Sequence, residues 1–513
     1  MSRFYDPNVI LALAASYDTR GLQGFSESIT NGRDQRKVNS MYEPVKNAFT
    51  GRTKLMLVNR PGLAVTGTYS ALSSTDNPFL PVLAGGVTSV VFRTGSSTRV
   101  AGASTVTITT HAQIYPVYTD ETNISGIRTG VIQLFNSNTE EYTTYYSSTG
   151  TVWTKIGHAN YTSGVQWTGK MEHMDGFAFH MNSSSQVRNS SVNSLADWGA
   201  NDYVTKSIEQ DSARGLIRHG RTLLALGIET VEGFYNAGRK SGSPLARMPQ
   251  LAQRIGLSMN SSLGTPFAEP INGQRHYYAS LGGRTYFVGG SGNEVGGGRS
   301  PSVYAFDGSR FEKVSSPFVD KMLVNNSLST NDAFHVQAMT VYGKACIAIS
   351  LVDNNTATQR ALVFFPEWND WFEWNSTGFQ FVGSGGVFFG IGGTTNASTV
   401  AGFFEFSITG CQDAGTSYTM LHQFKLPKED NGKARMDFAG LVGDTALDNP
   451  NANVSTSLSY DGYSTFTYVG NINMASQDKQ LSRLGAFKEC EVRLEYSGST
   501  QIRLEKFIAR VRK

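Results

Sequence analysis

Three short segments at nearly constant spacing constrain the fold more than any other feature of the chain. They begin at Gly220, Gly283 and Gly343, which lie 63 and 60 residues apart, and each continues with a basic residue, a small residue and an apolar run. A glycine followed by such a run is typical of a turn that leads into a strand. A period of this length holds about four short strands with their loops, as in one blade of a β-propeller. The repeat therefore predicts a β-propeller.

The composition favours an all-β chain with many turns. There are 54 glycines among 513 residues, and Ser, Thr and Asn are abundant throughout. Glycine adopts positive φ at little cost, and the short polar side chains bond to nearby backbone, so both suit turns better than helices. The length alone would suggest about three ordinary domains, but a propeller can use it as one unit. We expect one all-β propeller with an extended N-terminal segment and a C-terminal β-hairpin region. The predicted boundaries are 1–65 for the extended segment, 66–170 for early blades or an insertion, 171–430 for the main blades, and 431–513 for strands that close the propeller or form subunit contacts.

Two Asp-Gly pairs predict tight hairpins in the middle of the chain, at Asp175-Gly176 and at Asp307-Gly308. Residues 364–374 are rich in aromatic side chains and predict two strands joined at a Trp-Asn-Asp turn. Aromatic pairs that face each other across such a hairpin most often fill a core. The alternative interpretation is a platform on which a sugar ring stacks.

The last 80 residues predict further strands. Residues 459–466 indicate a hairpin turn similar to an Asp box, and residues 491–496 and 502–511 alternate strictly between apolar and charged side chains. Because charges at every second position suit a face exposed to water, we expect the last two segments to be outer or edge strands.

Charge and cysteine content exclude several classes of function. The formal net charge is only +3, so no strong overall field drives nucleic-acid binding. The three cysteines lack the spacing of a disulfide framework or a zinc site. No apolar stretch approaches the roughly 20 residues that cross a bilayer, so we expect no stable membrane insertion.

The chain carries no recognisable motif of enzyme chemistry. Zinc-protease, phosphate-loop and nucleophile-elbow motifs are missing, and the glycine-rich run at 289–298 lacks dinucleotide-binding spacing. His173 and His180 flank Asp175, a spacing that suits loop or core histidines better than metal ligands. We therefore expect no catalytic residues, no cofactor and no metal.

One local cluster of positive charge is a candidate contact site. Arg239, Lys240, Arg247 and Arg254 lie in a 16-residue stretch that contains no acidic residue and has prolines at 244 and 249. This pattern predicts a projecting basic loop. It either contacts DNA phosphates or an acidic neighbouring subunit, or is a solvated loop without a partner.

Seven sequence blocks, taken in order, resemble the tail nozzle and packaged-DNA stabilization proteins of short-tailed bacteriophages. Each block is short, and their order along nearly the whole chain carries the resemblance. Phe234 replaces a tryptophan of the family pattern, Tyr463 replaces a glycine, and 66–170 contains no matching block. The blocks are RKVNSMYE at 36–43, RPGL at 60–63, MDGF at 174–177, GIETVEGFYNAG at 227–238 with SPLAR at 243–247, VY at 303–304 with VSSP at 314–317, SYDG at 459–462 and RLG at 483–485.

The resemblance implies a structural virion protein and a six-bladed propeller. Members of this family form rings, usually homohexamers, below the portal and adaptor proteins and above tail-fibre or tail-tip proteins. The ring continues the channel for double-stranded DNA, retains the packaged genome and conducts it during ejection. Such a protein belongs to the viral tail and is assembled in the cytoplasm of the host bacterium. The low net charge is compatible with a channel along which DNA must slide.

Two alternatives remain open at this stage. A glycan-degrading propeller enzyme would need two carboxylates roughly 5–10 Å apart in a cleft, and such a pair could come from different blades. A receptor-binding protein at the tail tip would use the aromatic side chains of residues 364–374.

Overall fold

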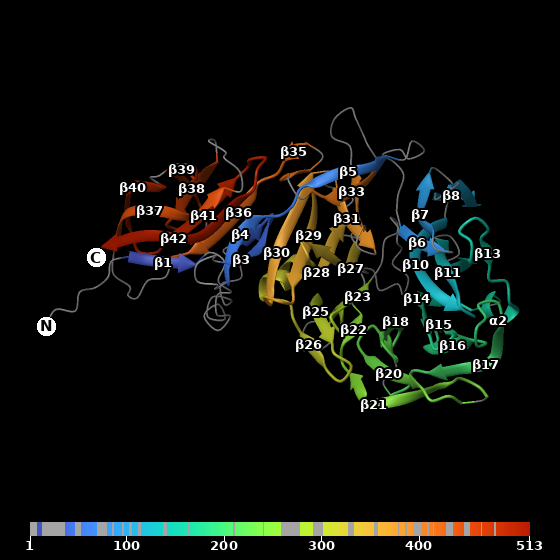
Figure 1. The fold of residues 1–513 in the computed structure, drawn as a ribbon. Helices are drawn as coiled ribbons and strands as arrows, with labels where there is room; N and C mark the ends of the chain where they lie inside the picture. The colour runs from blue at the N-terminus through green and yellow to red at the C-terminus, as the bar shows by residue number, and fades with distance from the viewer. Residues whose placement is uncertain are drawn as a thin grey trace.

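The computed structural model shows an all-β chain built around a β-propeller (Figure 1). Only two helices lie among the described residues, α2 (Ala159–Thr162) and α3 (Pro317–Asn326). The structure describes residues 8–12, 36–46, 53–68, 80–84, 87–94, 97–101, 105–110, 114–136, 141–162, 165–208, 211–239, 241–257, 277–290, 301–326, 333–352, 358–377, 379–384, 387–392, 402–407, 410–413, 415–426, 434–445, 452–462, 464–476 and 479–512.

Six consecutive antiparallel units form blades, and neighbouring strands along the chain pair within each unit, except in the fifth, where the first and second strands both pair with the third. The units are β6 (Leu80–Ala84), β7 (Val87–Thr94), β8 (Ser97–Ala101) and β9 (Thr105–Thr109); β10 (Ile114–Ile124), β11 (Ile127–Asn136), β12 (Glu141–Ser147) and β13 (Thr154–Lys155); β14 (Trp167–Met174), β15 (Phe177–Asn182), β16 (Gln186–Ser190) and β17 (Trp198–Thr205); β18 (Ala213–His219), β19 (Thr222–Gly227), β20 (Val231–Asn236) and β21 (Leu245–Gln253); β22 (Gly256–Leu257), β23 (Tyr278–Leu281), β24 (Arg284–Gly290), β25 (Pro301–Phe306) and β26 (Phe311–Lys313); and β27 (Ala333–Val341), β28 (Lys344–Val352), β29 (Thr358–Phe365) and β30 (Asp370–Thr377).

The repeat read from the sequence marks the same turn in successive blades. Gly220, Gly283 and Gly343 all have positive φ and precede β19, β24 and β28. Gly126 and Gly176 occupy the equivalent turns before β11 and β15. Each glycine therefore supplies the left-handed backbone that a tight hairpin requires. The prediction that these segments are turns leading into strands is confirmed.

Replacing Gly343 with alanine is expected to lower the free energy of unfolding by about 1 kcal/mol. The φ of Gly343 is 73°, and nothing lies within 4 Å of the added Cβ, so the cost comes from backbone conformation alone. Urea unfolding measures the loss. The matched control is Gly157→Ala, where space is equally open and φ is not positive; we expect a change within about 0.5 kcal/mol there. Equal losses at both sites would contradict the explanation.

A further sheet combines strands from both ends of the propeller region. β31 (Phe379–Ser384) and β32 (Val387–Gly392) form a hairpin beside the sixth blade, and β33 (Gly402–Phe406) lies next to β32. The partner of β33 is β5 (Leu63–Thr68), more than 300 residues earlier in the chain. A strand from the start of the propeller thus completes the sheet at its end, and β34 (Gln412–Asp413) and β35 (Thr416–Ser417) extend it.

Side chains from blades that are not neighbours meet at the centre of the propeller. Glu172 on β14 bonds to Tyr278 on β23, although the β18–β21 blade lies between their two blades in chain order. Blades that are not neighbours can meet only near the axis. All eight residues of β14 are buried, so the first strand of this blade faces protein on both sides and lines no open channel.

Beside the propeller, two sheets from the two ends of the chain pack face to face (Figure 1, blue and red). Phe424 of one sheet and Phe507 of the other meet edge to face at 5.2 Å. One sheet contains β1 (Asn8–Ala12), β3 (Ser40–Lys46), β4 (Thr53–Asn59), β37 (Ala434–Thr445), β40 (Gln480–Phe487) and β42 (Ile502–Arg512); the other contains β2 (Arg36–Val38), β36 (Met420–Lys425), β38 (Asn453–Ser459), β39 (Thr467–Asn473) and β41 (Glu491–Tyr496). The strands beyond residue 431 therefore pair with this body, and β5 supplies the strand at the propeller's end.

The expectation that the last two strands lie at a sheet edge is wrong. β41 lies between β36 and β38, and β42 pairs with β37 on one side and with β1 and β4 on the other. Alternation reports that one face of a strand is buried and the other is not. It carries no information about how many strands lie on either side.

The aromatic hairpin at residues 364–374 belongs to the core. Phe365 and Trp374 are fully buried, and Trp371 donates its indole N–H to the carbonyl oxygen of Val314 at 2.9 Å. Asn369 adopts a φ of 50° in the turn between β29 and β30. The core interpretation is confirmed, because the other aromatic side chains of this hairpin are also buried and Trp371 is half-buried.

Candidate functional site

A buried polar cluster lies where the first strands of the blades converge. Lys170 Nζ is 3.1 Å from Asp120 Oδ2 and 3.7 Å from Glu172 Oε1. Tyr278 donates its hydroxyl to the Glu172 carboxylate at 2.8 Å. These four residues, Asp120, Lys170, Glu172 and Tyr278, are called the axial cluster. They come from β10, β14 and β23, so three blades contribute to it.

The pKa values of the two carboxylates of the axial cluster are shifted in opposite directions. Burial raises the pKa of Glu172 to about 7, and the negative charge of Asp120 acts in the same direction. Burial alone would also raise the pKa of Asp120, but Lys170 and His173 outweigh it and hold that pKa below its usual value. The Lys170 pKa is raised because the two carboxylates outweigh its burial. Near neutral pH, Asp120 and Lys170 are therefore charged and Glu172 is partly protonated.

Glu172 is expected to make the protein less stable as the pH rises toward neutrality. Its pKa in the folded state exceeds the value of 4.5 for a free side chain, so the folded protein binds this proton more tightly. The stabilisation by protonated Glu172 is complete below about pH 4.5. It decreases as the pH rises to about 7, by about 2–3 kcal/mol. Urea unfolding across this range should show the loss in the unaltered protein and a flatter profile in Glu172→Gln. Identical profiles would contradict the assignment.

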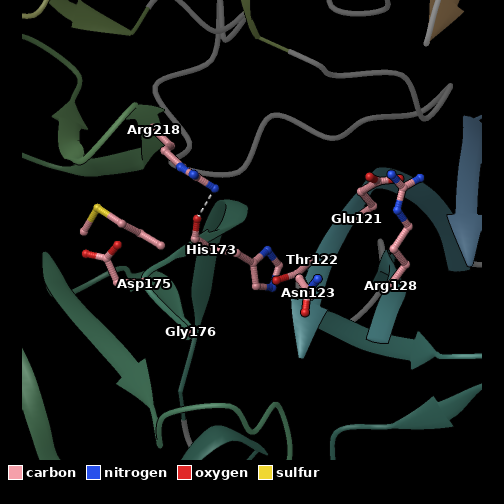
Figure 2. Close-up of a pocket in the computed structure, with 9 residues that line it drawn as sticks. Glu121, Thr122, Asn123, Arg128, His173, Asp175, Gly176 and Arg218 are labelled. Atoms are coloured by element: carbon pink, nitrogen blue, oxygen red, sulfur yellow. Dashed lines mark hydrogen bonds between the residues drawn. The ribbon is translucent and has the colours of Figure 1, made fainter. Parts of the chain in front are cut away.

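A pocket of about 400 Å³ opens beside the axial cluster, at one end of the inner strands (Figure 2). Its walls come from the β10–β11 hairpin, the end of β14 with its turn, and β18. The residues that line it are Glu121, Thr122, Asn123, Arg128, His173, Met174, Asp175, Gly176 and Arg218.

The Asp175-Gly176 turn has the predicted geometry, with φ values of 52° and 83°. Asp307-Gly308 differs, because only Gly308 has positive φ and the turn is longer.

His173 and His180 have different environments although both lie near Asp175. His180 is buried and stacks on Trp167 at 4.5 Å, and burial lowers its pKa to about 3, so it is a neutral core residue. His173 lines the pocket. The part of the chain that the structure describes contains no group of three His, Cys, Asp or Glu residues placed to hold a metal ion.

Two of the sequence blocks meet in a joint between the propeller and the two-sheet body. Arg60 is fully buried, and its guanidinium donates to both carboxylate oxygens of Asp413 and, at 2.9 Å, to Asn39 Oδ1. β2 pairs with β30 of the sixth blade on one side and with β36 on the other. Arg36 adds an ion pair of 2.6 Å to the buried carboxylate of Glu373. The two parts are thus connected by a continuous sheet and by buried ion pairs.

Other blocks of the resemblance also contact one another in pairs. In three of the four pairs the two residues belong to different blocks, and in the fourth they belong to the two parts of one block. The contacts are Arg60 Nε to Asn39 Oδ1 at 2.9 Å, Asn236 Nδ2 to Asp175 Oδ2 at 3.1 Å, the backbone N–H of Val303 to Ser315 Oγ at 3.0 Å, and the Tyr460 hydroxyl to the Leu484 carbonyl oxygen at 2.6 Å. The blocks therefore mark residues that position strands and turns.

The predicted basic loop is largely a strand. Residues 245–253 form β21, which among the described strands pairs only with β20 and so is an edge strand that tolerates Pro249. Arg239 precedes this strand and Arg254 follows it, so the two residues lie beyond opposite ends of β21. The expectation of one projecting loop with a single cluster of charge is therefore wrong. Prolines within the stretch suggested a loop, but they are compatible with an edge strand.

The four basic residues have different surroundings. Arg239 is exposed, and Lys240 lies outside the described residues. Within its own subunit, Arg247 donates to Ser207 Oγ at 2.6 Å and forms an ion pair with the Glu232 carboxylate at 3.6 Å. Arg254 is exposed. Arg239 and Arg254 are the members whose exposure suits an external contact.

Sequence reasoning missed the axial cluster. Asp120, Lys170 and Tyr278 are far apart in the chain, and only the convergence of blades brings them together. One signal was present: Lys170 and Glu172 are charged at alternate positions of β14, between residues of an otherwise buried strand. Charges facing inward on such a strand need partners, so this pattern could have indicated a buried polar site.

Comparisons with known proteins identify similar folds only. No protein-family model and no curated protein sequence matches the chain significantly. Among solved structures, the β-propeller domain of the Trilobed protease from Pyrococcus furiosus is 9% identical, with a TM-score of 0.35, over 65% of this chain and 93% of that domain. An oligogalacturonate lyase in complex with manganese is 8% identical, with a TM-score of 0.29, over 70% and 80%. A β-fructofuranosidase from Schwanniomyces occidentalis is 8% identical, with a TM-score of 0.27, over 88% and 98%.

Two further observations concern the described residues alone. None of their helices is long and apolar enough to span a membrane. Cys346, Cys411 and Cys490 are buried free thiols, and burial raises the pKa of each. Thiolates are the reactive form of cysteine, so these side chains act as core residues.

Proposed function

We propose that this chain is a structural protein of the tail of a short-tailed bacteriophage. Six copies form a ring below the portal and adaptor proteins, and the ring continues the DNA channel, retains the packaged genome and conducts it during ejection. The observation that carries the proposal is the ordered set of sequence blocks together with their pairwise contacts in the fold. The buried joint supports it, because a ring under DNA pressure needs its two parts held rigidly together.

The side chains that meet at the propeller centre limit where DNA could pass. The first strand of the third blade is buried along its whole length, and the axial cluster occupies the convergence point. In the proposed ring, the channel for DNA therefore lies between the copies, and the axis of each propeller stays closed. The six-fold arrangement uses one heterologous interface repeated around the ring.

Native mass determination and negative-stain imaging of the purified protein, alone and with portal complexes, test the proposal. We expect a closed ring, or a monomer that becomes a ring on the portal. A monomer that ignores the portal would contradict the ring. Arg239→Glu tests the exposed cation beside β21: if it contacts DNA or a neighbouring copy, reversal weakens genome retention or ring assembly without changing monomer unfolding. Arg310→Glu is the control, because Arg310 is also exposed but pairs with Asp307 at 3.3 Å.

A glycan-degrading enzyme is a second candidate, favoured by one observation. Asp120 and Glu172 approach the same ammonium group and have opposite pKa shifts, an arrangement that suits a base or nucleophile paired with an acid. Neither residue is among those that line the pocket. Incubating the protein with host polysaccharide separates the two candidates. Chain shortening that Glu172→Gln abolishes would support the enzyme. Unchanged polysaccharide would contradict the enzyme and favour the structural role.

A further inference from the structure

His173 lines the pocket and has one buried ring nitrogen without a hydrogen-bond partner. The residue is only 6% exposed, and Nε2 finds no hydrogen-bond partner among the described residues. Its other ring nitrogen, Nδ1, lies 3.4 Å from Asp120 Oδ2. Because the Asp120 carboxylate can only accept a hydrogen bond, Nδ1 carries the ring proton and Nε2 is left as an acceptor. An unpaired buried acceptor costs free energy, so a ligand that donates a hydrogen bond to it gains affinity.

The rest of the pocket offers donors and acceptors in balance. The Thr122 hydroxyl and the Asn123 amide face it from the β10–β11 hairpin, and the Arg218 guanidinium lies on the opposite side, as Figure 2 shows. The formal charges of the lining residues cancel. Arg128 and Arg218 carry two positive charges, and Glu121 and Asp175 carry two negative charges. A strongly charged ligand would therefore meet like charge on one wall. A neutral ligand with many hydroxyl groups meets a partner on every side, since each hydroxyl both donates and accepts.

The walls of the pocket are fixed before any ligand arrives. Arg218 donates to the carbonyl oxygen of His173 at 2.5 Å, and Asn236 donates to Asp175 at 3.1 Å. The Asn123 side chain accepts the backbone N–H of Gly126 at 2.8 Å, which holds the hairpin turn. Preorganised polar groups lose little conformational entropy on binding. The volume of about 400 Å³ lies at the small end of the range for ligand sites.

We propose that this pocket binds one neutral sugar unit, with a sugar hydroxyl donating to His173 Nε2 and other hydroxyls bonding to Thr122 and Arg218. The pocket lies at one end of the inner strands β10, β14 and β18, and the ligand we expect there is a terminal residue of a longer glycan. The proposal does not depend on the ring: sugar binding is measured on the purified protein, and ring formation by its mass.

Ligand-observed saturation-transfer NMR on the full chain tests the site with D-glucose, D-galactose and N-acetyl-D-glucosamine as probes. Inorganic phosphate is the charged comparison. We expect saturation of at least one sugar, and no displacement of that sugar by phosphate. Thr122→Val keeps the shape and removes one hydroxyl, and we expect it to weaken binding about tenfold. Thr143→Val is the matched control, a half-buried threonine on β12 outside the pocket, and it should leave affinity unchanged.

His173→Gln and Arg218→Met complete the test. Both are expected to weaken sugar binding at least tenfold, and unfolding measurements show whether each variant folds. Arg218 is exposed, so its variant and Thr122→Val remain informative if the His173 variant does not fold. The proposal is overturned if none of the three sugars shows saturation, if phosphate displaces a bound sugar, or if Thr122→Val and Thr143→Val bind equally well.

Discussion

Replacing Arg60 with leucine is expected to lower the free energy of unfolding by about 3–5 kcal/mol, because the change leaves the buried Asp413 carboxylate without its counter-charge. The Arg60 side chain is fully buried and that of Asp413 is 5% exposed. All five guanidinium N–H groups of Arg60 have acceptors. The acceptors are the two Asp413 oxygens, Asn39 Oδ1, and the carbonyl oxygens of Pro61 and Asn375.

The pKa of Arg60 shows which effect prevails at this site. Burial lowers it, but the charge and hydrogen bonds of Asp413 outweigh burial and raise the pKa above its ordinary value. The Tyr418 ring lies 3.9 Å from the guanidinium carbon and adds a cation–π contact. Arg60 therefore stays charged, and the loss on mutation comes mainly from the stranded carboxylate.

Urea unfolding followed by tryptophan fluorescence measures the Arg60→Leu loss. The double variant Arg60→Leu/Asp413→Leu should recover part of it, because removing both partners leaves no buried charge. The control is Arg284→Leu: Arg284 and Glu312 form an exposed pair at 3.2 Å, with side chains 39% and 49% exposed, and its loss costs at most about 1 kcal/mol. Similar losses for Arg60→Leu and Arg284→Leu would contradict a structural joint.

Replacing Trp167 with alanine is expected to cost about 3–5 kcal/mol, because the change opens a cavity in the third blade. Trp167 is 1% exposed, and its ring lies parallel to that of His180 at 4.5 Å and close to that of Tyr161 at 4.6 Å. Its indole N–H donates to the carbonyl oxygen of Tyr161 at 2.8 Å. Alanine loses the stacking, the buried area and this bond together.

Trp167→Phe is the graded control for the cavity. Phenylalanine keeps a stacked ring but gives up the indole bond and part of the volume, so the loss should be smaller than for alanine. Urea unfolding of both variants, with near-ultraviolet circular dichroism to report aromatic packing, measures the difference. A loss below about 1 kcal/mol for Trp167→Ala would show that the blade repacks around the gap.

Local features of the fold were predictable because they depend on residues close together in the chain. The turn glycines at 220, 283 and 343 need positive φ whatever surrounds them, and the spacing between them is one blade. The aromatic run at 364–374 was assigned correctly to the core, since large apolar side chains at alternate positions of a hairpin pack against each other. In both cases the sequence neighbours are also the structural neighbours.

Contacts between distant segments were not predictable from one sequence. The basic stretch at 239–254 was assigned to a loop, yet pairing with β20 makes most of it an edge strand. The axial cluster needs residues from three blades, and no periodicity links Asp120 to Tyr278. The pocket and the unpartnered His173 nitrogen follow from the same convergence.

The sequence alone determined the strand content, the repeat length and the turns, because backbone preference and side-chain alternation are local properties. Only the tertiary structure decided that β5 completes the sheet of β33, that β41 and β42 are central strands, and that Arg60 meets Asp413 across more than 350 residues. Those pairings depend on which unpaired strand edges and which buried charges come together when the chain folds. Their free energy depends on spatial proximity, which sequence separation does not specify.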